Sequence, residues 1–196
     1  MTSRVTLISP ATSRSLREAR FDDGSPLDTR GVARAEAAAG TLPAADRVVV
    51  SPTVRCRETA SSLGLAALDQ AELGALDMGH WRGRTLEEVS TWEPEAVSRW
   101  LSAPAVAPPG GESVLALCER VTIWLDAASE VVGRTLAVVE PEIVRAVVVT
   151  VLKAPSAAFW RLDVPPLTAT HISGRSGRWN LRLGQALGTQ QAGAED

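Results

Sequence analysis

The sequence lacks the features that mark membrane proteins and nucleic-acid-binding proteins. Its apolar runs, such as 146–152, are far shorter than the roughly 20 residues of a membrane-spanning helix, and no apolar signal segment precedes the first predicted strand. The formal net charge of −3 gives no cationic footprint for nucleic acid or for an anionic membrane. We therefore expect a cytoplasmic protein that binds neither nucleic acid nor membrane.

Cysteine and histidine are scarce, with two of each in the chain. Cys56 and Cys118 show no metal-ligand spacing, and we expect both to be reduced and buried or half-buried. No glycine-rich stretch matches a phosphate-binding loop or a dinucleotide fingerprint. The sequence therefore predicts neither a bound metal nor a cofactor.

What the sequence does contain is an alternation of short apolar runs with helical patterns. We expect strands at 5–8, 47–50, 135–139, 162–164, 169–173 and 178–183, and helices at 29–40, 57–65, 113–132, 143–152 and from residue 85. Such alternation is typical of a parallel sheet with helices on both faces. We predict an α/β fold, a three-layer α/β/α sandwich with a mostly parallel central sheet. A single domain is expected over 1–184, with a disordered tail over 185–196.

Five short motifs lie in order along the chain, at 23–31, 48–60, 77–89, 108–113 and 136–145. Residues 51–60 read Ser-Pro-Thr-Val-Arg-Cys-Arg-Glu-Thr-Ala, and residues 108–113 read Pro-Pro-Gly-Gly-Glu-Ser. These motifs resemble those of the histidine phosphatase superfamily, the phosphoglycerate-mutase-like proteins. The resemblance covers most of the chain and implies that family's phosphoglycerate-mutase-like fold.

The resemblance also implies which positions would carry the family's chemistry, and those positions are replaced. Ser9 stands in the place of the first phosphate-binding arginine, and Pro10 in the place of the histidine that becomes phosphorylated. Glu140 takes the place of the second histidine, and Ala75 that of the acid. Proline has no ionisable group and no N–H. The resemblance therefore implies a pseudoenzyme, without phosphohistidine-dependent phosphatase or mutase activity.

The retained polar residues of the motifs define a candidate ligand cleft. Ligands of open α/β sheets bind beyond the carboxyl ends of the strands. Ser9, Arg55 and Glu140 each follow a predicted strand, so we expect these segments to converge. The candidate cleft residues are Arg55, Asp77, His80, Trp81, Glu112, Glu140 and Arg145.

Two functions are compatible with this altered cleft. In the first, Arg55 pairs with Glu140, and the protein has a binding or regulatory role toward a small anionic ligand or a protein partner. Glu140 would repel a bound phosphate dianion. This electrostatic repulsion costs about 4 kcal/mol per unit of like charge at ~4 Å and an effective dielectric near 20. In the alternative, the protein is a repurposed enzyme in which Glu140 is a base and Arg55 orients an anionic substrate. A family-like homodimer is consistent with either.

These two hypotheses make different predictions about the cleft. A closed Arg55–Glu140 pair favours the non-catalytic protein, which is the hypothesis that we prefer from the sequence. An open apolar pocket that holds an unpaired carboxylate, or one with a raised pKa, favours the repurposed enzyme.

Overall fold

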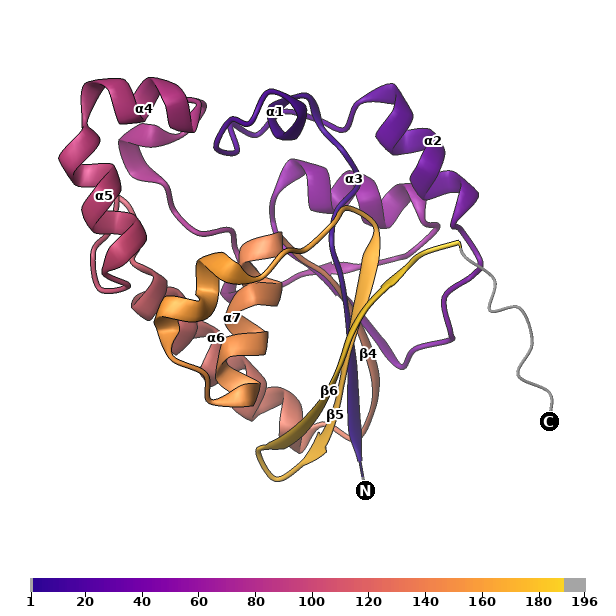
Figure 1. Cartoon of the computed structure of the whole chain (residues 1–196). Coiled ribbons are helices and arrows are strands. Elements are labelled where there is room, and N and C mark those ends of the chain that lie inside the picture. Colours follow the sequence, from indigo (N-terminus) through magenta and orange to yellow (C-terminus); the bar gives the residue numbers. More distant parts are fainter. Residues whose placement is uncertain (1, 189–196) are drawn as a thin grey trace, which may run out of the picture.

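The computed structural model describes residues 2–188, without the side chain of Leu183. In this part of the chain six strands form one sheet in the order β3-β2-β4-β1-β5-β6 (Figure 1). Neighbouring strands from β3 to β1 are parallel, whereas β5 pairs antiparallel with both β1 and β6. The strands are β1 Ser3–Ile8, β2 Arg47–Val50, β3 Leu68–Asp69, β4 Gly133–Val138, β5 Thr168–Arg175 and β6 Arg178–Ala186.

Helices cover the two faces of this sheet as separate layers (Figure 1). Apolar side chains of α6 and α7 pack on one face in the larger core cluster, and those of α2 and α3 pack on the other face. The helices are α1 Arg14–Arg17, α2 Thr29–Ala37, α3 Val54–Ser62, α4 Leu86–Trp92, α5 Pro94–Ser102, α6 Val114–Glu130 and α7 Pro141–Leu152. The predicted three-layer, mostly parallel α/β fold is confirmed.

The starts of several helices follow local capping signals. The Thr85 hydroxyl accepts a hydrogen bond from the Glu88 N–H, and the Glu88 carboxylate accepts one from the Thr85 N–H, which completes the predicted capping box of α4. The hydroxyl of Ser113 caps α6, and Leu117 and Trp124 on that helix are buried in the core as its spacing predicts.

The structure corrects several of the predicted elements. Residues 162–164 form no strand, because two prolines follow them and proline has no N–H to donate to a sheet. Helix α3 begins at Val54 rather than at 57. Strand β6 continues through Ala186, past the start of the predicted tail at 185. The rest of that predicted tail, 189–196, lies outside the described residues.

Helix α5 is absent from the sequence-based prediction, and it belongs to a small aromatic subdomain beside the sheet. Its Trp100 packs in a T-shaped geometry on Trp81, with ring centroids 5.4 Å apart, and the centroid of the Trp160 ring lies 4.4 Å from that of Trp100.

Both cysteines are free, and no described helix combines the length and apolar character needed to cross a bilayer.

Close backbone contact between two loops explains Gly111 of the 108–113 motif and Gly79 of the 77–89 motif. A Cβ on Gly111 would lie 2.3 Å from the carbonyl oxygen of Asp77, and one on Gly79 would lie 2.3 Å from that of Pro109. The two loops are further joined by a hydrogen bond from the Glu112 N–H to the Asp77 carbonyl, at 2.7 Å. The glycines therefore let residues 77–81 and 108–112 run against each other.

We predict that Gly111→Ala destabilises the protein by about 1–3 kcal/mol, since the added methyl group must displace a backbone carbonyl. Gly184→Ala is the matched control, because a Cβ at that position would have no other atom within 4 Å. Urea unfolding monitored by tryptophan fluorescence measures both variants. Equal midpoints for the two variants would contradict the close-contact explanation.

Candidate functional site

Three segments meet at the carboxyl edge of the sheet, where the sequence predicts a cleft. Ser9 follows β1, Ser51 follows β2, and Glu140 lies two residues beyond β4. The Ser51 N–H donates to the Val138 carbonyl, and the Val139 N–H donates to the Ile8 carbonyl, each at 2.9 Å. These bonds extend the parallel pairing past the strand ends and hold the three segments side by side.

Arg55 and Glu140 form a closed, buried ion pair at this edge. Arg55 lies in the first turn of α3 and is 7% exposed, whereas Glu140 is the N-cap of α7 and is fully buried. The Arg55 Nε lies 2.9 Å from Glu140 Oε1 and 2.8 Å from Oε2, and its Nη2 lies 2.5 Å from Oε2. The Thr53 hydroxyl donates to Oε1 at 2.7 Å. Both carboxylate oxygens are therefore occupied by groups of the chain itself.

The electrostatics of the pair favour the charged arginine. Burial alone lowers the pKa of the Arg55 guanidinium, but the charge and hydrogen bonds of Glu140 outweigh burial, and the pKa stands above its ordinary value. The carboxylates of Glu142 and Asp22 act in the same direction. Three carboxylates thus raise the pKa of one arginine, and Glu140 has the largest effect among them.

An open cavity of about 520 Å³ lies beside this pair. Its apolar wall includes Phe21, Trp100 and Trp160, and its charged groups include Asp22, Arg55, Glu142, Arg145 and Asp163. Burial raises the pKa of the Asp22 carboxyl, and Glu140 adds to this shift while Arg55 opposes it. Asp22 Oδ1 and Glu142 Oε2 are buried and have no hydrogen-bond partner among residues 2–188, although Asp22 Oδ1 lies 3.8 Å from the Arg55 Nε as a longer ion pair. The cavity therefore has carboxylate oxygens whose hydrogen-bonding capacity is not met by the described part of the chain.

Ser9 and Pro10, which replace the family's phosphate-binding arginine and phosphorylated histidine, have structural roles. The Ser9 hydroxyl donates to the Pro165 carbonyl at 2.6 Å and accepts from the Thr168 N–H at 3.0 Å. The Pro10 carbonyl accepts a hydrogen bond from the Leu167 N–H. The thiol of Cys56, the residue after Arg55, stays protonated, because burial raises its pKa well above its ordinary value.

Two more of the sequence-predicted positions, Arg145 and Ala75, line the cavity. The Arg145 Nε donates to the Leu162 carbonyl at 2.8 Å, and its guanidinium lies 5.9 Å from the centre of the Trp160 ring. Asp77 is exposed and lines a smaller adjoining hollow of about 370 Å³. Ala75 borders both spaces.

The other three candidate residues do not line these spaces. Trp81 is 1% exposed inside the aromatic cluster, and His80 is exposed on the loop that contacts Pro109. Glu112 pairs with Arg120 at 2.9 Å, and Arg120 also donates to the Gly74 carbonyl. Glu112 thus helps to hold the loop that carries Ala75, and it does not face the cavity.

Asp22 is the cavity residue that sequence reasoning missed. It lies in the irregular segment between α1 and α2, one residue before the motif at 23–31. The adjacency to that motif is the signal that could have found it. The motif gives no indication of which neighbouring side chain turns inward.

The comparisons with known proteins identify the superfamily and the fold. A model of the histidine phosphatase superfamily (branch 1) matches residues 12–186, and the chain belongs to this superfamily. A putative alpha-ribazole-5'-P phosphatase from Escherichia coli superposes with a TM-score of 0.85 at 21% identity, over 96% of this chain and 99% of that chain. A mycobacterial glucosyl-3-phosphoglycerate phosphatase gives a TM-score of 0.81 at 22% identity, over 95% and 100%. Both likenesses show the fold.

A curated relative is similar over a shorter stretch. A bifunctional protein of Mycobacterium tuberculosis is 37% identical over 78 residues, which are 38% of this chain and 21% of that protein. The match thus spans about a fifth of the length of the curated relative.

We predict strong coupling between Arg55 and Glu140. Arg55→Met leaves a buried carboxylate without its partner and should lower the free energy of unfolding by about 3–5 kcal/mol at neutral pH. Adding Glu140→Leu should restore most of this loss, because both charges are then removed. Urea unfolding of the double-mutant cycle measures the coupling.

Arg57→Met is the control, because Arg57 lies on the same helix in an exposed ion pair. This substitution should change the free energy of unfolding by less than about 1 kcal/mol. Additive effects of the two buried substitutions would contradict the coupling.

We also predict that Asp22 makes stability depend on pH. Its pKa in the folded protein lies above its unfolded value, so the folded state binds the proton more tightly. The free energy of unfolding therefore falls as the pH rises through the folded pKa. Asp22→Asn removes this loss, so the stability of the variant relative to wild type should rise as the pH increases above the ordinary pKa of an aspartate. Denaturant unfolding across this pH range measures it, and parallel curves would refute the assignment.

Proposed function

We propose that this member of the superfamily is non-catalytic and acts by binding a ligand or partner at the remodelled cleft. The observation that carries the proposal is the Arg55–Glu140 pair, in which the arginine available to a phosphate already binds an internal carboxylate. A phosphate dianion would have to displace Glu140 from a fully buried position. The energetic cost of an unpaired buried carboxylate opposes that exchange.

The location of the histidines supports the same proposal. The chain has two, and neither His80 nor His171 lines the cavity beside Arg55. The segment after β1 offers Ser9 and Pro10 in their place, and the Ser9 hydroxyl is committed to the 165–168 loop. A phosphohistidine would therefore have no side chain on which to form at this edge of the sheet.

The cavity itself remains suitable for a ligand. Its volume of about 520 Å³ lies within the range of small-molecule sites, and its wall combines aromatic rings with a few polar groups. Because Asp22 Oδ1 and Glu142 Oε2 lack hydrogen-bond partners within the described residues, a ligand with hydrogen-bond donors would fit better than a phosphate. The proposed role is thus binding or regulation without phosphoryl transfer.

The Asp22 carboxyl favours one second candidate, a repurposed enzyme. Glu140 is a poor base because both of its oxygens already accept hydrogen bonds. Asp22 instead combines a raised pKa with a position in the cavity wall, which are properties of a general acid. If the protein is a repurposed enzyme, wild type turns over a substrate and Asp22→Asn abolishes that turnover. If the protein is non-catalytic, wild type shows no turnover.

The test compares wild type with Glu140→Gln and Arg55→Ala. We expect phosphate and orthovanadate to leave the melting temperature of wild type unchanged, because Arg55 is occupied. Glu140→Gln keeps the shape and releases the arginine charge, so vanadate should raise the melting temperature of that variant. The rise should be absent in the double variant Glu140→Gln/Arg55→Ala.

Hydrolysis of p-nitrophenyl phosphate provides the decisive contrary result. We expect wild type to show no turnover. Turnover that is lost in Arg55→Ala and retained in Arg57→Ala would overturn the proposal, since Arg57 lies on the same helix with an exposed side chain. Turnover that persists in both variants would indicate a contaminating activity, and purification to constant specific activity resolves that outcome.

A further inference from the structure

The opposite end of the sheet carries a second hollow, which is independent of the cleft. On the face covered by α2 and α3, each helix has nine residues and is about 13 Å long, whereas β1 and β4 are each about 20 Å long. The two helices pack over Ile8, Val50 and Val138 near the carboxyl ends. The amino-terminal halves of β1 and β4 are left open on this face.

The open part of the sheet is polar in sequence. Side chains at alternate positions of a strand share a face, so Arg4 and Thr6 of β1 lie on the same side as Ile8. Arg4 is paired in register with Arg134 of β4, and Thr6 with His171 of β5. His171 is in turn paired with Arg182 of β6. Neighbouring strands thus bring three arginines and a histidine to one surface.

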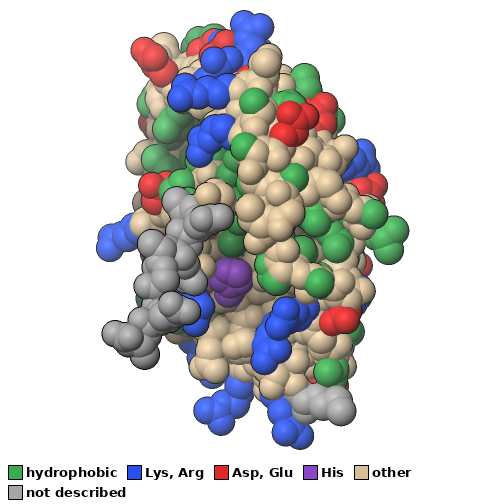
Figure 2. Space-filling view, turned by 90° about the vertical axis from the view of Figure 1, so that its right-hand side faces the viewer, with side chains coloured by type: hydrophobic (Ala, Val, Ile, Leu, Met, Phe, Trp, Pro, Cys, Tyr) green, Lys and Arg blue, Asp and Glu red, His purple; other side chains and the backbone are tan. Residues whose placement is uncertain are grey.

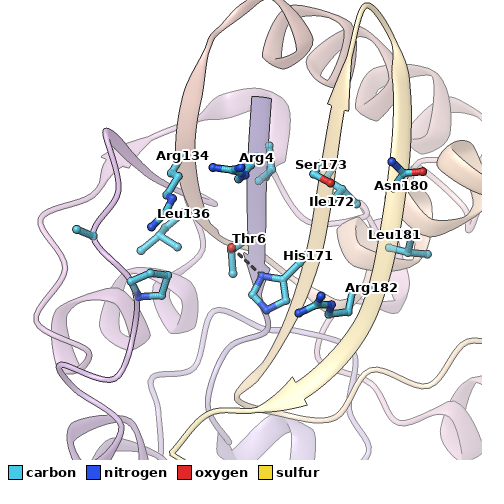
Figure 3. A pocket seen from close by; sticks show the side chains of 13 residues that line it. Arg4, Thr6, Arg134, Leu136, His171, Ile172, Ser173, Asn180, Leu181 and Arg182 are labelled. Carbon is cyan, nitrogen blue, oxygen red and sulfur yellow. Dashed lines mark hydrogen bonds between the residues drawn. The ribbon is translucent and has the colours of Figure 1, made fainter. Parts of the chain in front are cut away.

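These side chains line a cavity of about 510 Å³ (Figure 3). In Figure 3, Arg182 lies beside His171, and Arg4 and Arg134 lie near each other on the adjoining strands. Figure 2 shows a histidine in a hollow of this side of the molecule, with basic side chains nearby. Among residues 2–188 no aspartate or glutamate lines the cavity. Its charged lining is therefore entirely cationic in the described chain.

The cationic groups have no partner in the described structure. The side chains of Arg4, Arg134 and Arg182 make no hydrogen bond or ion pair with any residue described. Asp46, just before β2, lies close by, but its Oδ2 accepts the backbone N–H of Arg134 at 2.8 Å. The His171 ring is fixed by a 3.0 Å hydrogen bond between Nδ1 and the Thr6 hydroxyl. A held ring and three free guanidinium groups thus face one concave space.

We propose that this hollow binds a small, soluble anion with two or more negative charges, such as a polyphosphate or a polycarboxylate. Guanidinium groups recognise phosphate and carboxylate oxygens with paired N–H donors. The volume suits a small molecule. The lining contains no phenylalanine or tryptophan on which a nucleic-acid base would stack, and the chain as a whole is acidic. A compact polyanion is therefore the occupant that the charges and the shape favour.

His171 supplies a local reporter of this binding. Burial lowers the pKa of its imidazole, and the charge of Arg182 adds to that effect. The other charged side chains that line the hollow are Arg4 on β1 and Arg134 on β4, and Asp46 before β2 accepts the backbone N–H of Arg134. An anion between these groups offsets the positive charge and raises the pKa of His171. Binding should consequently be coupled to proton uptake by His171.

The test is an NMR titration of the full chain with inorganic pyrophosphate and, separately, with citrate. The chain has two histidines, and His80→Gln assigns the imidazole signals of His171. We expect saturable binding that raises the pKa of His171, with affinity reduced about tenfold by Arg4→Gln and by Arg134→Gln. Arg30→Gln is the control, because it makes the same charge change at an exposed position on α2.

Two results would overturn the proposal. One is the absence of a change in the His171 pKa at millimolar concentrations of both anions. The other is an equal loss of affinity in Arg30→Gln and Arg4→Gln, which would indicate non-specific screening of a cationic surface. Because the hollow lies away from Arg55, the measurement is independent of the function proposed for the cleft.

Discussion

The buried pair of Arg55 and Glu140 is the constraint on which the carboxyl edge of this sheet depends. It joins the start of α3 to the start of α7, and these helices lie on opposite faces of the sheet. Helix N-termini carry partial positive charge and favour an anion. The anion at this edge is Glu140, a side chain of the protein itself. The site thus keeps the electrostatic character of an anion site while its occupant is covalently part of the chain.

An internal anion changes what the rest of the cleft can hold. Once Glu140 neutralises Arg55, Asp22 keeps only the longer 3.8 Å contact between its Oδ1 and the Arg55 Nε, and Glu142 Oε2 has no hydrogen-bond partner among the described residues. Burial then favours the neutral form of Asp22, which is the reason for its raised pKa. The remaining cavity is a mixture of aromatic surface and hydrogen-bonding acid. The superfamily membership of the chain therefore says more about its architecture than about the chemistry of its ligand.

The sequence predicts the parts of this structure that follow from local patterns. Strand β2 and the capping box of α4 match their predicted positions because apolar runs and caps act over a few residues. The sequence also predicts the pairing of Arg55 with Glu140, since both follow parallel strands. Asp22, Glu112 and His80 show the limit of such reasoning. Membership of a motif places a residue near the cleft, whereas the direction of its side chain depends on loop packing that no periodic pattern encodes.

The length of the helices determines where this fold exposes its sheet. Helix α6 has 17 residues and is about 25 Å long, which is enough to follow the full length of a strand on its face. The nine-residue helices α2 and α3 on the other face are about half that length. The strand positions beyond their reach line the hollow, and here they carry Arg4, Thr6 and Arg134 beside Leu136, whereas the strand positions under the helices carry Ile8, Val50 and Val138. Polar residues on central strands are therefore the sequence signature of an incomplete helical layer. The resulting hollow is a property of the architecture as much as of the arginines that line it.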